Sequence, residues 1–210
     1  AGSVKADEGM WIPMLIGKNY EQMKKQGFKL TAQDLYNANG SSLKDAIVHF
    51  GGFCTGEIVS DKGLIFTNHH CGYDAVASNS TPENNILDNG FYAKNYGEEK
   101  PMNGLFVRFL RRMEDVTAKV NEATKGLSGA EKAAKMNDAF TAIAKAAVTG
   151  PTIEANVKDF YKSNQFILFV YERFDDVRLV GAPPQSIGKF GGDTDNWEWP
   201  RQTGDFSVFR

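Results

Sequence analysis

A mainly β fold with helical additions is the fold class that this 210-residue sequence predicts, and three features support it. Residues 46–67 contain short β-prone runs separated by glycine turns. Further strand patterns follow at 105–111, 165–171 and 177–180. Residues 113–150 are instead rich in alanine, lysine and glutamate, with apolar side chains at helical spacing, which indicates an inserted helical segment.

Residues 1–45 are predicted to form an N-terminal helical segment. Apolar side chains recur at helical spacing over 10–25, and Gly27 ends the run. Thr31, with Asp34 three positions later, predicts a second, short helix. The threonine oxygen can accept hydrogen bonds from the free backbone amides at the start of a helix. An acidic residue is also favoured near those amides.

The strands are expected to form one β-barrel. Its first hairpins are predicted at three short runs: 46–50, 54–59 and 64–67. A run that begins at Asp205 is typical of the last strand. The barrel is therefore expected to span residues 46–112 and 160–210, with the helical segment 113–150 inserted between these parts.

The composition excludes several classes of partner. The 24 basic and 26 acidic residues give a formal net charge of −2, and no basic run suits a phosphate backbone, so nucleic acid is not an expected partner. No stretch approaches the ~20 consecutive apolar residues that span a bilayer, so no membrane span is expected. Residues 1–9 are either a tag remnant or a mature N-terminus left after a signal peptide is removed from a precursor.

The chain has two cysteines, Cys54 and Cys71. Their spacing suits one disulfide bond, and two residues are too few for a four-ligand zinc ribbon. A disulfide implies an oxidising compartment, so that the protein is expected to be periplasmic or secreted. The alternative is two free, buried thiols in a cytosolic protein.

His70 is the candidate general base. It follows a predicted hairpin and directly precedes Cys71. In this respect the segment resembles trypsin-like peptidases, in which the catalytic histidine follows a strand and directly precedes a cysteine. An imidazole can accept a hydroxyl proton and return it to a leaving amine. Its neighbour His69 is expected to be structural, and His49 to be a surface or core histidine. Adjacent strand residues point to opposite faces, which argues against a metal site at the histidine pair.

Asp205 is the candidate carboxylate that fixes the imidazole tautomer. Histidine before aspartate is the chain order of chymotrypsin-like peptidases. The nucleophilic serine is not expected within this chain. Ser128 lies in a Gly-Leu-Ser-Gly turn but is typical of a helix cap and precedes Asp205, whereas Ser207 is too near Asp205 in the chain. The nucleophile is therefore expected beyond Arg210.

Four motifs carry a family resemblance: Asp-Glu-Gly-Met-Trp at 7–11, Thr-Asn-His-His-Cys-Gly-Tyr-Asp at 67–74, Tyr-Glu-Arg-Phe at 171–174, and the stretch 191–207. On these motifs the chain resembles the N-terminal part of the bacterial dipeptidyl-peptidase 7 and dipeptidyl-peptidase 11 family of serine exopeptidases. The resemblance implies the first β-barrel of a chymotrypsin- or trypsin-like double barrel. It also implies a longer periplasmic protein with a large helical domain between its two barrels.

The same resemblance implies a serine-type dipeptidyl peptidase that releases dipeptides from peptides with a free N-terminus, without a metal or organic cofactor. Asn196 and Trp197 fall on the positions that hold the substrate's α-amino group, where an amide oxygen and an indole face suit an ammonium ion. Gln202, beside that motif, departs from the histidine of many members. This fragment, lacking the serine, is expected to be inactive, and a homodimer of the full-length protein is compatible with the sequence.

Two other functions stay open at this point. One is a non-catalytic, peptide-binding pseudo-peptidase, which a fluorophosphonate probe would not label. The other is a cytosolic protein with a metal site built from cysteine and histidine, in which the thiols would be free.

Overall fold

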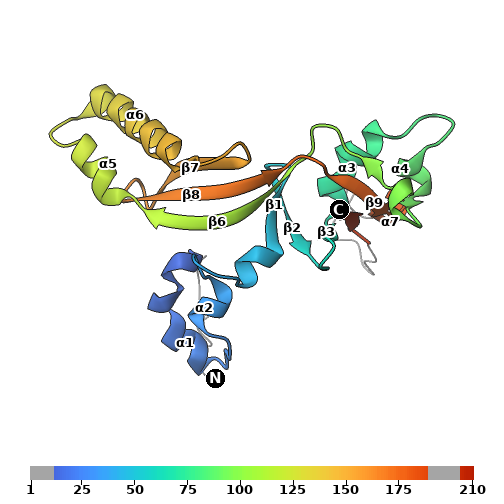
Figure 1. Cartoon of the computed structure of the whole chain (residues 1–210), viewed down its shortest axis with the longest axis horizontal. Helices are drawn as coiled ribbons and strands as arrows, with labels where there is room; N and C mark the ends of the chain where they lie inside the picture. Colours follow the sequence, from blue (N-terminus) through green and yellow to red (C-terminus); the bar gives the residue numbers. More distant parts are fainter. Residues whose placement is uncertain (1–11, 189–203) are drawn as a thin grey trace, which may run out of the picture. The chain divides into compact units, whose positions relative to one another are not determined.

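The computed structural model describes residues 12–188 and 204–210 (Figure 1). The chain divides into two compact units, residues 1–44 and residues 45–210. Both His70 and Asp205 belong to the second unit. Within the described residues, no helix is long and apolar enough to cross a membrane.

The first unit is helical. Its helices are η1 (Pro13–Lys18), α1 (Tyr20–Lys25) and α2 (Ala32–Leu35). The prediction of one continuous helix over 10–25 is wrong, because Asn19, a residue type that is unfavourable inside helices, separates η1 from α1. The predicted capping box is confirmed. The Thr31 hydroxyl accepts from the Asp34 amide at 3.1 Å, and the Asp34 carboxylate accepts from the Thr31 amide at 2.7 Å.

Antiparallel pairing joins the strands of the second unit, which follow η2 (Leu43–Ala46), into one sheet. The strands described are β1 (Ile47–Phe50), β2 (Cys54–Ile58), β3 (Ile65–Thr67), β4 (Phe91–Tyr92), β5 (Lys100–Pro101), β6 (Val107–Asp115), β7 (Ile153–Phe160), β8 (Gln165–Phe174), β9 (Arg178–Ala182) and β10 (Ser207–Phe209). They pair in the order β4-β9-β10-β3-β2-β1-β6-β8-β7. β5 pairs with β9, and β6, the next strand along the chain, pairs with β1, so the chain segment from β5 to β6 links the two ends of the path from β9 to β1. The predicted mainly β class and first barrel are confirmed.

The core of the barrel lies on one face of each strand. Buried and more exposed residues alternate in β1, β3 and β10, as expected for a strand with one face inward. Phe50 of β1 and Phe209 of β10 are fully buried, and their ring centroids lie 4.9 Å apart. Burying a large apolar side chain stabilises a fold by about 1.5–3 kcal/mol. This contact therefore joins the first and the last strand of the second unit in chain order.

β6 and β8 continue as a long paired ribbon, which β7 widens to three strands (Figure 1). The helices α5 (Thr117–Ala123) and α6 (Gly129–Ala147) follow β6, and α6 packs on β7. A second apolar core forms there around Val120, Phe166 and Leu168. The predicted helical insertion is therefore present. It is accompanied by β7, which was not predicted, because polar and charged residues interrupt its apolar pattern.

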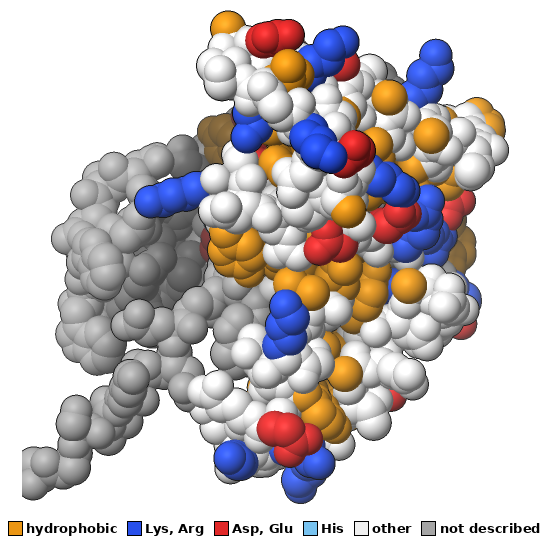
Figure 2. Space-filling model, turned by 90° about the vertical axis from the view of Figure 1, so that its left-hand side faces the viewer, with side chains coloured by type: hydrophobic (Ala, Val, Ile, Leu, Met, Phe, Trp, Pro, Cys, Tyr) orange, Lys and Arg blue, Asp and Glu red, His pale blue; other side chains and the backbone are white. Residues whose placement is uncertain are grey.

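The surface of the second unit carries charges of both signs. Arg111 pairs with Glu172 across β6 and β8, and Arg173 pairs with Glu154 of β7. On the face drawn in Figure 2, lysine and arginine side chains are interspersed with acidic ones. Exposed pairs of this kind contribute only about 0–1 kcal/mol each. The strand pairing and the two apolar cores are thus the main source of stability.

The remaining helices of the second unit are α3 (His69–Ser78), α4 (Ile86–Asn89), η3 (Tyr96–Glu98) and α7 (Gln185–Gly188). α3 comes close to β10 at Gly72. A β-carbon placed on Gly72 would lie 2.6 Å from Ser207 Oγ and 2.9 Å from Cζ of Phe209. Only glycine therefore lets α3 lie this near to β10.

Gly72→Ala should destabilise the 210-residue chain by about 1–3 kcal/mol, because the added methyl group overpacks the contact between α3 and β10. Urea unfolding measures this loss. Gly150→Ala is the matched control, since its new β-carbon would come no nearer than 3.9 Å to a heavy atom beyond its chain neighbours in the described residues. Equal effects of the two substitutions would contradict the close approach of α3 to β10.

Candidate active site

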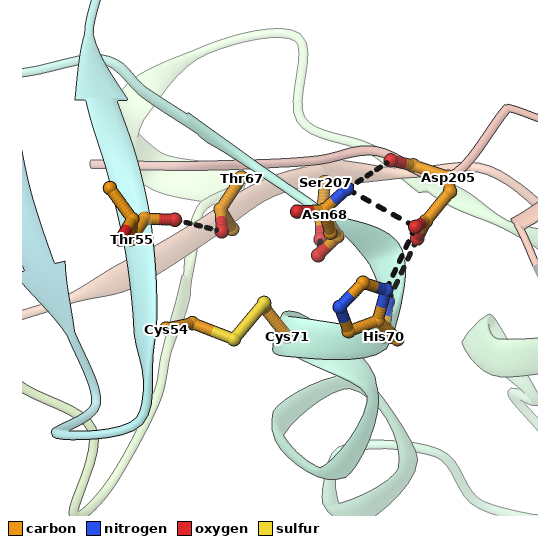
Figure 3. The surroundings of a disulfide bond; sticks show 8 residues. All are labelled: Cys54, Thr55, Thr67, Asn68, His70, Cys71, Asp205 and Ser207. Atoms are coloured by element: carbon orange, nitrogen blue, oxygen red, sulfur yellow. Dashed lines mark hydrogen bonds and ion pairs between the residues drawn. A yellow bond between two sulfur atoms is a disulfide. The ribbon is translucent and has the colours of Figure 1, made fainter. Parts of the chain in front are cut away.

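The hairpin of β2 and β3 leads directly into α3, which carries His70 in its first turn (Figure 3). This differs from the expectation of a histidine pair at a strand end. The chain turns into the helix at Asn68, whose backbone is still extended. His69 is fully buried, whereas the side chain of His70 is 68% exposed. The two adjacent histidines thus have different surroundings, with only His70 open to solvent.

A disulfide bond joins Cys54 of β2 to Cys71 of α3, with their Cα atoms 6.0 Å apart. It ties the first turn of α3 to the barrel immediately after His70 (Figure 3). Thr67, the last residue of β3, adds a second connection, because its hydroxyl donates to the Thr55 carbonyl at 2.8 Å. The end of β3 and the start of α3 are thus both fixed to β2.

Asp205 reaches the same place from the other end of the chain. It stands two residues before β10, and β10 pairs with β3 in a register that sets Ser207 opposite Thr67. Asp205 therefore lies beside the start of α3. Its Oδ2 atom is 2.8 Å from Nδ1 of His70, which the structure thus brings together with Asp205 across 135 positions of sequence (Figure 3).

The Asp205 carboxylate also caps α3. Its Oδ1 atom accepts from the backbone amide of His70 at 3.1 Å, and the amide of His69 contributes a further hydrogen bond. Free amides at a helix N-terminus favour a negative charge. Partial burial raises the pKa of the Asp205 carboxyl, but the hydrogen bonds from His70 and His69 and the charge of His70 outweigh it. The net pKa lies below the ordinary value of 3.8.

This geometry defines the state of the imidazole. An ionised carboxylate only accepts hydrogen bonds, so Nδ1 of His70 must carry the proton that it shares with Asp205. In the neutral ring the lone pair is then on Nε2, to which none of the described residues is hydrogen-bonded. An exposed ring with a free Nε2 lone pair can act as a general base.

The predicted substrate-binding residues and the two serines rejected as nucleophiles have different outcomes. Asn196 and Trp197 lie outside the described residues. Ser207 is fully buried, and its hydroxyl donates to the Asn68 carbonyl at 2.8 Å, so it is engaged in structure. Ser128 is the N-cap residue of α6, but its side chain makes no capping hydrogen bond.

The metal alternative meets an obstacle at the same place. Potential ligand atoms of Cys54, His70 and Cys71 lie within 4.8 Å of one another. Zinc is bound by thiolates, however, and both sulfur atoms are bonded to each other. The arrangement suits a disulfide beside a histidine.

Asn68 is a site residue that was not predicted. Its side chain contacts Asp205. The sequence does not predict this contact, because an asparagine before a helix is typical of a simple N-cap. The signal that could have found it is its place within the 67–74 motif, next to the histidine pair.

Comparisons with known proteins agree with the predicted resemblance. A family model described as Peptidase S46 matches residues 6–210. The chain is 53% identical over 204 residues to the Asp/Glu-specific dipeptidyl-peptidase of Capnocytophaga gingivalis, covering 96% of this chain and 29% of that protein. It is 48% identical over 209 residues to dipeptidyl-peptidase 7 of the same organism, covering 99% of this chain and 29% of that protein.

Solved structures show the same similarity. A crystal structure of Porphyromonas endodontalis DPP11 in complex with substrate is 44% identical, with a TM-score of 0.87, over 97% of this chain and 31% of that one. The complex of that protein with the dipeptide Arg-Asp is 44% identical, with a TM-score of 0.88, over 98% and 30%. The chain thus spans about three tenths of the length of the proteins that it matches.

The lowered pKa of Asp205 predicts a pH-dependent contribution to stability. A carboxyl whose pKa is lower in the folded state stabilises the fold above its unfolded pKa of 3.8, and this stabilisation is lost as the pH falls through the lowered pKa. Asp205→Asn should therefore destabilise the chain at about pH 6, with a difference from wild type that shrinks below pH 3.8. Denaturant unfolding over this pH range measures the difference.

Asp61→Asn, in the exposed turn between β2 and β3, is the control for the loss of one acidic group. A destabilisation by Asp205→Asn that does not depend on pH would show that the carboxylate is not held as an anion by its neighbours.

Proposed function

The chain belongs to the peptidase S46 family, and on that premise we propose that the full-length protein is a serine-type dipeptidyl peptidase. It releases dipeptides from the free N-terminus of peptides. The observation that carries this proposal is the 2.8 Å hydrogen bond between His70 Nδ1 and Asp205 Oδ2, beside an exposed ring. The relatives at 48–53% identity are named as dipeptidyl peptidases, which supports the same activity.

In the proposed mechanism, His70 is the general base and then the general acid. A serine supplied by the protein beyond Arg210 attacks the carbonyl carbon of the second peptide bond, while Nε2 of His70 takes the hydroxyl proton. His70 then gives that proton to the leaving amine as the C–N bond breaks. A water molecule hydrolyses the resulting acyl-enzyme by the same route, and the released serine regains its proton.

Asp205 acts on the imidazole throughout the cycle. It accepts the Nδ1 proton, which fixes the tautomer, and its negative charge stabilises the imidazolium that forms in each half of the reaction. The hydrogen bonds from His69 and His70 keep Asp205 ionised, so that it does not itself take the proton. Because the nucleophilic serine is proposed to lie beyond Arg210, the 210-residue fragment alone is proposed to be inactive.

Asn196 and Trp197 are proposed to bind the α-amino group of the substrate. An asparagine oxygen accepts hydrogen bonds from an ammonium group, and an indole face attracts it. Their position in the chain supports this role, since they precede Asp205 by only a few residues. Holding the amino group at a fixed distance from the serine makes the enzyme cleave after two residues.

The activity is tested with the full-length protein on a peptide with a free N-terminus and on its N-acetylated form. We expect dipeptides to be released from the peptide with a free N-terminus and not from its N-acetylated form. Peptides with a hydrophobic second residue and peptides with an acidic one are assayed in parallel. His70→Ala should lower kcat about a million-fold and Asp205→Asn about ten-thousand-fold. His49→Ala, on β1, should leave kcat unchanged.

A fluorophosphonate probe separates the enzyme from a non-catalytic relative. An active serine peptidase is labelled at its nucleophile, and the labelling should be lost in the His70→Ala protein. An unlabelled full-length protein that still binds peptides would contradict the proposed catalysis and indicate a pseudo-peptidase.

The disulfide supports a further proposal, that the protein works in an oxidising compartment, either periplasmic or secreted. We expect mass spectrometry of the natively purified protein, digested without reduction, to find the peptides of Cys54 and Cys71 linked. Recovery of both peptides as alkylated free thiols would contradict the oxidising location.

A further inference from the structure

Asn68 makes contacts that its position as a helix N-cap does not require. Its side chain forms no capping hydrogen bond with α3. Instead, Nδ2 donates to Asp205 Oδ2 at 3.1 Å and lies 3.3 Å from the Asp205 backbone carbonyl (Figure 3). The same Oδ2 atom accepts from His70 Nδ1. Asn68 and His70 therefore donate to one oxygen atom of the carboxylate.

The backbone of Asn68 is fixed as well. Its carbonyl accepts from the buried Ser207 hydroxyl at 2.8 Å and from the Gly72 amide at 3.2 Å. Asn68 thus joins β10 to the start of α3 through its backbone and through its side chain. The amide group that donates to Asp205 consequently has little freedom to move.

His70 depends on such support, because its ring is largely exposed and little packing holds it. The orientation of the ring relies on the hydrogen bond to Asp205. That bond requires the Asp205 carboxylate to stay in one side-chain orientation. The backbone amide of His70 fixes Oδ1, and the Asn68 amide fixes Oδ2. Each oxygen thus has a donor other than the imidazole, and the carboxylate plane is held toward His70 Nδ1.

We propose that Asn68 is a positioning residue of the active site, which acts on catalysis by holding Asp205 Oδ2 toward His70. This inference rests on the proposed function, in which His70 is the base. It assigns to the residue before the histidine pair a role in the reaction that is separate from helix capping.

Two substitutions in the full-length enzyme separate donation from capping. Asn68→Ala removes the donor and also any side chain that could cap α3. Asn68→Asp keeps the shape and is an equally good N-cap, but an ionised carboxylate cannot donate and repels Asp205. If Asn68 only caps α3, the kcat of Asn68→Asp should resemble that of wild type. If Asn68 donates to Asp205, Asn68→Asp should lower kcat more than Asn68→Ala does.

We expect Asn68→Ala to lower kcat about 10- to 100-fold, as for the loss of a hydrogen bond to a charged group, with KM within about twofold of wild type. Asn68→Asp should lower kcat further. In an Asp205→Ala background, Asn68→Ala should change kcat less than about twofold, because the group on which Asn68 acts is gone. The control Asn121→Asp makes the same substitution at an exposed position of α5 and should leave kcat unchanged.

The proposal is overturned if Asn68→Asp retains wild-type kcat, or if Asn68→Ala costs the same factor with and without Asp205. Thermal unfolding of each variant identifies a loss that comes from unfolding. Proton NMR of the His70 Nδ1 proton gives a readout without turnover, assigned by its absence in His70→Ala. Asn68→Asp should shift or remove that signal, so the inference can be judged even if the wild-type protein releases no dipeptides.

Discussion

The antiparallel pairing of β10 with β3 is the constraint on which the candidate active site depends. Its register sets Ser207 opposite Thr67, and Asp205 is thereby carried to the start of α3. A strand register shifted by one residue would send every side chain of β10 to the other face. The barrel core would then be lost together with the contact between Asp205 and His70, so stability and the proposed chemistry rest on one register.

Several local features serve this same junction. The disulfide fixes Cys71 to β2, and Gly72 lets α3 approach β10 without a clash. Asp205 then satisfies amides at the start of α3 as well as the imidazole. One carboxylate thus caps the start of a helix and orients an imidazole ring. This double use explains how an exposed histidine can keep a defined orientation.

Much of this arrangement could be predicted from residue patterns. Short β-prone runs and glycine turns predicted most of the barrel strands, although the two-residue strands β4 and β5 were missed, and the cysteine spacing suited the bridge that the structure forms. The helical start at His69 was missed because Asp205, which caps it, is more than a hundred residues away in the chain. The role of Asn68 was missed for the same reason, since a partner supplied by long-range pairing leaves no local signal. Asn196 and Trp197 remain predictions.

The central claim is that folding places His70 and Asp205 in hydrogen-bonding register at the site of the reaction. A crystal structure of the full-length protein labelled by a fluorophosphonate tests it most directly. We predict His70 Nδ1 within hydrogen-bonding distance of Asp205 Oδ2, near the 2.8 Å found here, with the labelled serine oxygen close to Nε2. A labelled serine far from His70, or a carboxylate other than Asp205 beside Nδ1, would contradict the account.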